Sequence, residues 1–126
     1  MIVVDTSVWI EYFRGAALPE LDTALDAGAV VLSPIVLAEL LSAPLSRTNR
    51  HELSEALRDV PLHATGFDHW DRVGALRAKL GGLGVTISTP DAHVAQCALD
   101  LDGFVWSLDK VFRLASDVLP LALWAP

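Results

Sequence analysis

The chain has 126 residues, of which 52% are hydrophobic, and its 16 acidic residues against 9 basic ones give a formal net charge of −7. That length suits one globular domain, which we expect to span residues 1–126; the apolar stretches are too short to cross a membrane and the first residues carry no basic segment of a signal peptide, so we expect a cytoplasmic protein. The negative charge argues against a protein that binds nucleic acid by neutralising phosphates, unless divalent cations supply positive charge.

Short apolar runs alternate with segments of helical periodicity along the chain. The expected strands are residues 2–4, 30–32, 61–64, 104–107 and 119–124, of which the third and fifth are the weaker candidates. The expected helices are residues 7–13, 19–27, 35–43, 49–59, 68–80, 91–101 and 110–115. Apolar strands that alternate with helices are typical of a parallel sheet covered on both faces. We therefore predict an α/β fold, a three-layer α/β/α sandwich with a central parallel sheet.

Two of these helices begin with the same signal and carry a carboxylate. Ser33-Pro34 and Thr89-Pro90 each place a hydroxyl residue at the expected N-cap and proline at the first helical position. Glu39 lies on the first of these helices, and Asp91 lies in the first turn of the second.

Two further carboxylates follow expected strands. Asp5 comes directly after the first strand, and Asp109 comes two residues after the strand that ends at Ser107. Open parallel sheets bind ligands at the carboxyl ends of their strands, so acidic residues at this edge are candidates for a functional site. Together with Glu39 and Asp91 they form a set of hard oxygen ligands, which suits Mg²⁺ or Mn²⁺ and the metal-assisted cleavage of phosphodiesters.

Each carboxylate also has a purely structural explanation. Asp5 and Asp109 could cap the helices that follow them, and Asp91 could complement a helix dipole. Glu39 is harder to explain because apolar residues surround it in the sequence, and burying an unpaired carboxylate is costly. A metal or a basic partner would offset that cost, whereas a solvated position at the helix edge would avoid it; we favour the first.

Four segments, in this order and at these intervals, resemble the PIN-domain family. They are residues 3–9 (VVDTSVW), 33–41 (SPIVLAELL), 90–95 (PDAHVA) and 107–112 (SLDKVF). The resemblance covers essentially the whole chain, and the pattern is similar to that of VapC toxins of VapBC toxin–antitoxin systems.

The resemblance implies a homodimeric ribonuclease that depends on Mg²⁺ or Mn²⁺, cleaves RNA, and is the toxin of a pair with an antitoxin protein. It identifies as catalytic and metal-binding the residues Asp5, Glu39, Asp91 and Asp109. It identifies as supporting hydroxyls Thr6, Ser7 and Ser107. Relatives often carry another acidic residue where this chain has Val111, so a fifth carboxylate is not expected.

The charge of −7 and the surplus of carboxylates favour a basic antitoxin. An arginine presents a planar fork of donors that can bridge two carboxylates. We expect such an arginine to occupy the metal position and to block catalysis.

Other functions compete with this interpretation. A phosphatase of the haloacid dehalogenase type also begins with an aspartate after its first strand, but it needs a second aspartate where this chain has Ser7. A receiver domain needs a phospho-acceptor after a mid-chain strand, and none is suitable. A catalytically idle module that captures a basic peptide in the same acidic cleft is the alternative outside the enzymes.

The remaining candidates point less clearly to function. We expect His93 on a polar helix surface, and Cys97 as an inert buried thiol. His51, His63 and His69 show no metal-ligand spacing. Arg14, Arg47 and Arg50 could contact RNA phosphates, although isolated arginines are usually solvated. The aromatic residues suit a core or an interface, and the apolar surplus indicates a self-complementary dimer surface.

Overall fold

The computed structural model describes all residues from 1 to 126, and a four-stranded sheet lies at its centre. The strands are β1 (Ile2–Val4), β2 (Val30–Val31), β3 (Phe104–Trp106) and β4 (Ala122–Leu123). Their order is β2-β1-β3-β4, and every neighbouring pair is parallel. The central strand β1 is fully apolar and buried on both faces, as expected for a strand that is covered by helices on each side. The predicted α/β class with a parallel sheet is confirmed.

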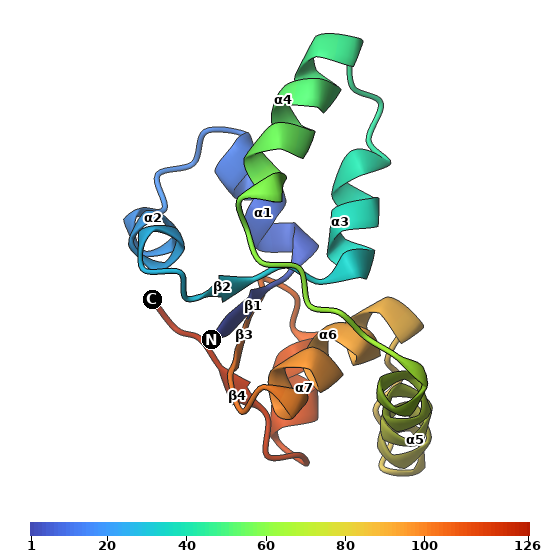
Figure 1. Cartoon of the computed structure of the whole chain (residues 1–126). Coiled ribbons are helices and arrows are strands. Elements are labelled where there is room, and N and C mark those ends of the chain that lie inside the picture. The colour runs from blue at the N-terminus through green and yellow to red at the C-terminus, as the bar shows by residue number, and fades with distance from the viewer.

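Seven helices surround this sheet. They are α1 (Thr6–Phe13), α2 (Pro19–Asp26), α3 (Pro34–Leu41), α4 (Arg47–Arg58), α5 (Phe67–Gly82), α6 (Thr89–Asp100) and α7 (Val111–Ser116). Figure 1 shows α1, α3 and α4 above the sheet as drawn, and α5, α6 and α7 below it and to the right. None of the helices is both long and apolar enough to span a membrane.

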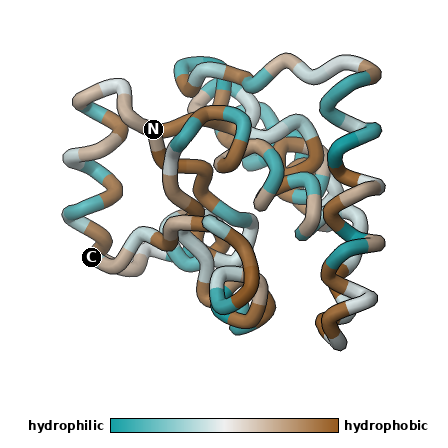
Figure 2. The backbone as a smooth tube through the Cα atoms, turned by 90° about the horizontal axis from the view of Figure 1, so that it is seen from below, coloured by the Kyte–Doolittle hydropathy of each residue, from teal (hydrophilic) through white to brown (hydrophobic).

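The buried core joins the strands to the inner faces of the helices. It contains 27 buried hydrophobic residues, among them all of β1 and most of the inner face of α6. Figure 2 shows hydrophilic and hydrophobic residues alternating along the outlying helices, which is the pattern of helices with one face toward water. Helix α6 differs from these, because its residues from Ala92 to Ala98 are all buried. It therefore passes through the middle of the molecule and carries Asp91 at its start.

The weaker strand predictions are only partly confirmed. Between α4 and α5, the segment 61–64 contributes one isolated parallel bridge, between Leu32 and Leu62. The last expected strand shortens to the two residues of β4 at the sheet edge. A strand at an edge has one neighbour only, so its length depends on that neighbour more than on its own sequence.

Of the two predicted Ser/Thr-Pro helix caps, one is confirmed and one lies a residue earlier. Ser33 caps α3 as expected, and its Oγ accepts hydrogen bonds from the backbone N–H groups of Ile35 and Val36. For α6, the N-cap is Ser88 and not Thr89, and the Ser88 Oγ accepts from the N–H of Asp91. Proline is equally tolerated at the second helical position, because its missing N–H is unpaired there too.

Candidate metal centre

Asp5 lies where β1 ends, and its side chain is held by two hydroxyl groups. Its backbone N–H donates to the carbonyl of Trp106 on β3 over 2.9 Å, which continues the pairing of the two strands. The carboxylate Oδ2 accepts hydrogen bonds from Ser7 Oγ (2.9 Å) and Ser107 Oγ (2.8 Å). Asp5 occupies the N-cap position of α1, but its side chain makes no capping bond. The residue is only 7% exposed, so its orientation is closely determined.

The two serines connect the carboxyl ends of β1 and β3. Ser7 Oγ accepts from the backbone N–H of Leu108 (3.0 Å), and Ser107 Oγ accepts from the N–H of Asp109 (2.9 Å). The two hydroxyl oxygens lie 3.3 Å apart. Each hydroxyl therefore donates to Asp5 and accepts from the loop after β3, which places Asp109 near Asp5.

Glu39 lies on α3, which packs beside α1. Thr6 Oγ1 donates a hydrogen bond to Glu39 Oε1 over 3.2 Å. The expectation that Glu39 is buried is wrong, because the residue is exposed at the edge of its helix. Its apolar sequence neighbours pack inward on other faces of a short helix. Partial desolvation nevertheless raises the pKa of Glu39, and the negative charges of Asp5 and Asp91 raise it further, against the opposing effect of the Thr6 hydrogen bond.

Asp91 lies in the first turn of α6, close to both strand ends. Desolvation raises the pKa of Asp91, and the charges of Asp5 and Asp109 add to this effect while Ser88 opposes it. Asp109 itself is exposed, and its Oδ1 accepts a hydrogen bond from the N–H of Val111 at the start of α7. Asp109 thus also helps to begin α7, as its structural explanation predicts.

The fold brings the four predicted carboxylates to the same end of the sheet. Ser107 joins Asp5 to the backbone of Asp109, and Thr6, next to Asp5, donates to Glu39. Asp91 lies close enough for the charges of Asp5 and Asp109 to raise its pKa. None of the four forms a salt bridge with a lysine, arginine or histidine. They are not drawn into contact, since no three of them have ligand oxygens all within 4.8 Å of one another. The donor set contains only oxygens, carries up to four negative charges and is not neutralised by any salt bridge within the protein. These properties fit a hard divalent cation.

A cavity of about 280 Å³ lies beside Asp109 and brings two basic side chains near the carboxylates. Its lining includes Ser107, Asp109, Lys110 and Arg113. The sequence pattern did not single out these two cations; of the three arginines that it suggested for RNA contact, Arg14 is exposed and pairs with Glu11. The available signal was their spacing, one and four residues after Asp109 in a segment that begins a helix.

His93 does not lie on a helix surface as expected. It is completely buried, and Trp70 stacks on its ring with centroids 4.7 Å apart. Burial lowers the pKa of His93 to about 4, and the neighbouring His69 and His63 lower it as well. His93 is therefore a neutral interior side chain.

Comparisons with known proteins identify the family of this chain. The sequence matches the PIN domain family over residues 2–117. No curated protein sequence matches it significantly.

Several solved structures share the fold. The VapBC2 structure from Rickettsia felis, bound to a DNA fragment from its promoter, superposes with a TM-score of 0.81 at 19% identity, covering 99% of this chain and 100% of that one. FitAcB from Neisseria gonorrhoeae superposes with a TM-score of 0.71 at 22% identity, and the match covers 99% of this chain and 97% of that one. DNA-bound VapBC from Salmonella typhimurium superposes with a TM-score of 0.78 at 16% identity, and the match covers 97% of this chain and 94% of that one. Since the family match spans most of its length, the chain belongs to the PIN-domain family.

Proposed function

We propose that this protein is an endoribonuclease that depends on Mg²⁺ or Mn²⁺ and hydrolyses phosphodiester bonds in RNA. The observation that carries the proposal is the group of four carboxylates at the carboxyl edge of a parallel sheet, none of them in a salt bridge, in a PIN-domain chain. The residues that would hold the metal are Asp5, Glu39, Asp91 and Asp109. A bound divalent cation would activate water and neutralise charge on the phosphate.

The chain's own residues prepare this site in two ways. Ser7 and Ser107 occupy Asp5 Oδ2 and leave its second oxygen available as a ligand. Thr6 orients Glu39 in the same manner. Ligands that are held by outer hydrogen bonds lose little conformational freedom when a metal binds. The three hydroxyls therefore act as positioning residues.

Lys110 and Arg113 are the basic side chains best placed to contact the RNA backbone. They line the cavity next to Asp109, where a phosphate on its way to the carboxylates would pass. Such contacts would reduce the electrostatic barrier that a charge of −7 presents to RNA.

The biological setting follows from the structural neighbours. Those structures are of VapBC and FitAcB, and a related structure from Klebsiella pneumoniae is a toxin–antitoxin complex. We infer that this chain is likewise the cytoplasmic toxin of such a pair, inhibited by a basic antitoxin protein. Incubating the purified chain with cellular RNA, with and without Mg²⁺, tests the catalytic half of this proposal. Absence of new RNA ends in both conditions would favour the idle binding module.

Neutralising Glu39 should stabilise the metal-free protein. Because burial and neighbouring charges raise the pKa of Glu39, its ionised form costs folding free energy at pH 7, and Glu39→Gln removes that cost. In EDTA the variant should melt at a higher temperature than the wild type. Mg²⁺ at about ten times its Kd should stabilise the wild type by about 1.4 kcal/mol and the variant by less. Glu52→Gln, an exposed change on α4, is the control and should alter neither melt.

We expect a homodimer in solution. Several large apolar side chains are exposed, and Phe67 is 86% accessible at the start of α5. Exposed apolar residues of this size indicate an interface. Light scattering at micromolar concentration should give about twice the chain mass of 13.6 kDa. A monomer mass at that concentration would refute the expectation.

An arginine of the antitoxin should inhibit by binding the four carboxylates. Its fork of donors can bridge two of them in place of the metal. An antitoxin in which this arginine is replaced by alanine should still bind through apolar contacts but should inhibit poorly, as measured by RNA cleavage at saturating antitoxin. The hypothesis fails if a structure of the complex shows no basic side chain within hydrogen-bonding reach of the carboxylates.

A further inference from the structure

A second group of polar side chains lies inside the molecule, where α5 and α6 meet the start of α3. Ser33 Oγ and His93 Nε2 lie 2.7 Å apart, and His93 Nδ1 lies 2.7 Å from His69 Nε2. His69 Nδ1 in turn lies 2.9 Å from Asp100 Oδ2. Ser33, His69 and His93 are each less than 5% exposed. This chain of hydrogen bonds is separate from the four carboxylates.

For neutral imidazoles, the acceptor at one end sets the direction of every hydrogen bond in this chain. The Asp100 carboxylate only accepts, so a neutral His69 carries its proton on Nδ1 and offers a lone pair at Nε2. His93 then donates from Nδ1 to that lone pair and accepts at Nε2 from the Ser33 hydroxyl. The Ser33 Oγ lone pairs accept from two backbone N–H groups at the start of α3, so the hydroxyl hydrogen is free to donate to His93. His69 Nε2 is therefore an oriented, basic nitrogen in the interior.

Two more side chains with ligand-type atoms lie near His69. Cys97 is buried one turn after His93 on α6, and His63 lies on the connector between α4 and α5. One ligand atom from each of His63, His69 and Cys97 lies within 4.8 Å of the other two. The spacing of these residues in the sequence does not predict the group. His69 and Cys97 are 28 residues apart, and only the conformation of the connector brings His63 to them.

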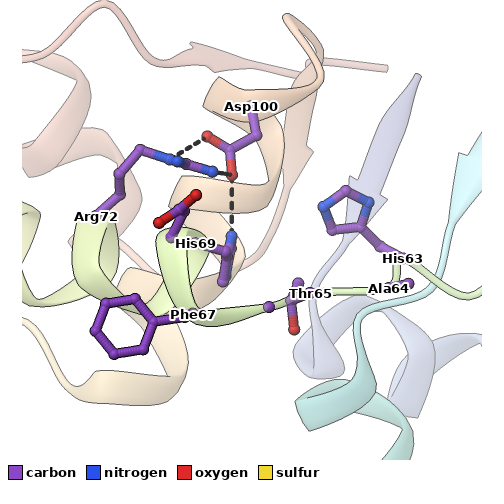
Figure 3. Close-up of a pocket in the computed structure, with 9 residues that line it drawn as sticks. His63, Ala64, Thr65, Phe67, His69, Arg72 and Asp100 are labelled. Atoms are coloured by element: carbon purple, nitrogen blue, oxygen red, sulfur yellow. Dashed lines mark hydrogen bonds and ion pairs between the residues drawn. The ribbon is translucent and has the colours of Figure 1, made fainter.

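The group is reached from a surface cavity. A cavity of about 390 Å³ has His63, His69, Arg72 and Asp100 in its wall. Figure 3 shows His63 and His69 beside this cavity, with Asp100 joined by hydrogen bonds both to His69 and to Arg72. Solvent and a small ion therefore have a path to the histidines.

We propose that His63, His69 and Cys97 form a zinc-binding site, distinct from the carboxylates. Two imidazole nitrogens and one thiolate are a donor set that selects Zn²⁺ over Mg²⁺, and water from the cavity would complete a tetrahedral sphere. Asp100 accepts from the far side of the His69 ring, which is the carboxylate–histidine arrangement that orients zinc ligands. The bound ion would join the connector to α5 and α6, and so stabilise the fold.

Zinc binding requires two local changes. Cys97 must lose its thiol proton to solvent, since the thiolate is the ligand. The lone pair of His69 Nε2 must bind the ion in place of the His93 N–H, and because His93 Nδ1 lies only 2.7 Å from that nitrogen, the His93 ring must shift to make room for the ion. His93 Nδ1 already lies 3.9 Å from Cys97 Sγ, so the released N–H can donate to the zinc-bound thiolate instead. Every buried donor thus keeps an acceptor.

The ligand atoms must also approach one another. Tetrahedral bond lengths of about 2.0–2.3 Å place ligand atoms roughly 3.3–3.8 Å apart. His63 is the ligand able to make this adjustment, because it is only partly buried and lies on a connector without helical structure. His69 and Cys97 are held by their helices.

Cobalt is the probe that distinguishes this site from the carboxylates. Metal-free protein in excess Mg²⁺ should bind one Co²⁺ per chain and develop both the near-ultraviolet thiolate-to-cobalt charge-transfer band and the visible bands of tetrahedral cobalt. Zn²⁺ should displace the cobalt and raise the melting temperature. Asp5→Asn should leave these bands unchanged, so that the outcome is independent of the ribonuclease proposal.

Three variants locate the ligands. Cys97→Ser should lose the charge-transfer band, and His63→Ala should weaken Co²⁺ binding at least about tenfold, whereas His51→Ala, an exposed change on α4, should have no effect. If Cys97→Ser fails to fold, His63→Ala decides, since that side chain is not part of the core. A wild type without the charge-transfer band, or a His63→Ala variant that binds Co²⁺ as tightly as the wild type, would overturn the proposal.

Discussion

Asp5→Asn should lower the rate of metal-dependent RNA cleavage by about a thousandfold while leaving the fold intact. The amide is nearly isosteric with the carboxylate and can still accept from Ser7 and Ser107, so the connection between the ends of β1 and β3 should survive. The variant loses one negative charge at the most buried of the four carboxylates. With its oxygen held by the two serines, the amide turns its NH2 group toward the metal position, and because NH2 cannot ligate a hard cation, metal binding and cleavage should both fall.

The measurement is cleavage of a cellular RNA pool at saturating Mg²⁺, with mapping of the new ends. Circular dichroism should show the same helix content in variant and wild type. Asp26→Asn, an exposed aspartate on α2, is the matched control and should retain full activity. Full activity in Asp5→Asn would refute the metal-site assignment, and equal losses in both variants would point to a general effect of charge.

The second large effect is on stability. Asp100→Ala should lower the free energy of unfolding by about 2–4 kcal/mol. Asp100 accepts two hydrogen bonds from Arg72, one from Gln96 and one from the buried His69. Alanine leaves the His69 Nδ1–H without an acceptor in the interior, and an unsatisfied buried donor is costly. Asp71→Ala removes the same charge from an exposed position next to Arg72, and should cost little.

The same substitution should change the response to acid. Burial pushes the pKa of Asp100 upward, but hydrogen bonds from Arg72, His69 and Gln96 outweigh it and hold the pKa well below its usual range. A lowered folded-state pKa stabilises the protein above the unfolded value of about 3.9, and this stabilisation is lost as pH falls toward the folded value. The difference in unfolding free energy between wild type and Asp100→Ala should therefore be largest near neutral pH and shrink below about pH 4. Denaturant titrations at several pH values measure it, and a difference independent of pH would contradict the assignment.

Local sequence patterns determined the fold class and the positions of the candidate ligands. The apolar run of β1 ends at Asp5, and the segment that ends at Trp106 precedes Asp109 closely. Such features depend on periodicity, capping and turn chemistry within a few residues, so the strands, the helices and the four carboxylates were predictable. Even there, the N-cap of α6 is Ser88, one residue before the predicted Thr89, because either neighbouring hydroxyl can make the capping hydrogen bond.

Only the tertiary structure decided which polar side chains are buried and with what they are paired. The hydroxyls of Ser7 and Ser107 meet across 100 residues of sequence. Glu39 is exposed although its sequence neighbours are apolar, because consecutive residues of a helix lie on different faces of it. His93 is buried because its partners Ser33 and His69, which are 60 and 24 residues away, satisfy both ring nitrogens. Burial of a polar group depends on partners brought by other elements, and no local pattern in the sequence contains that information.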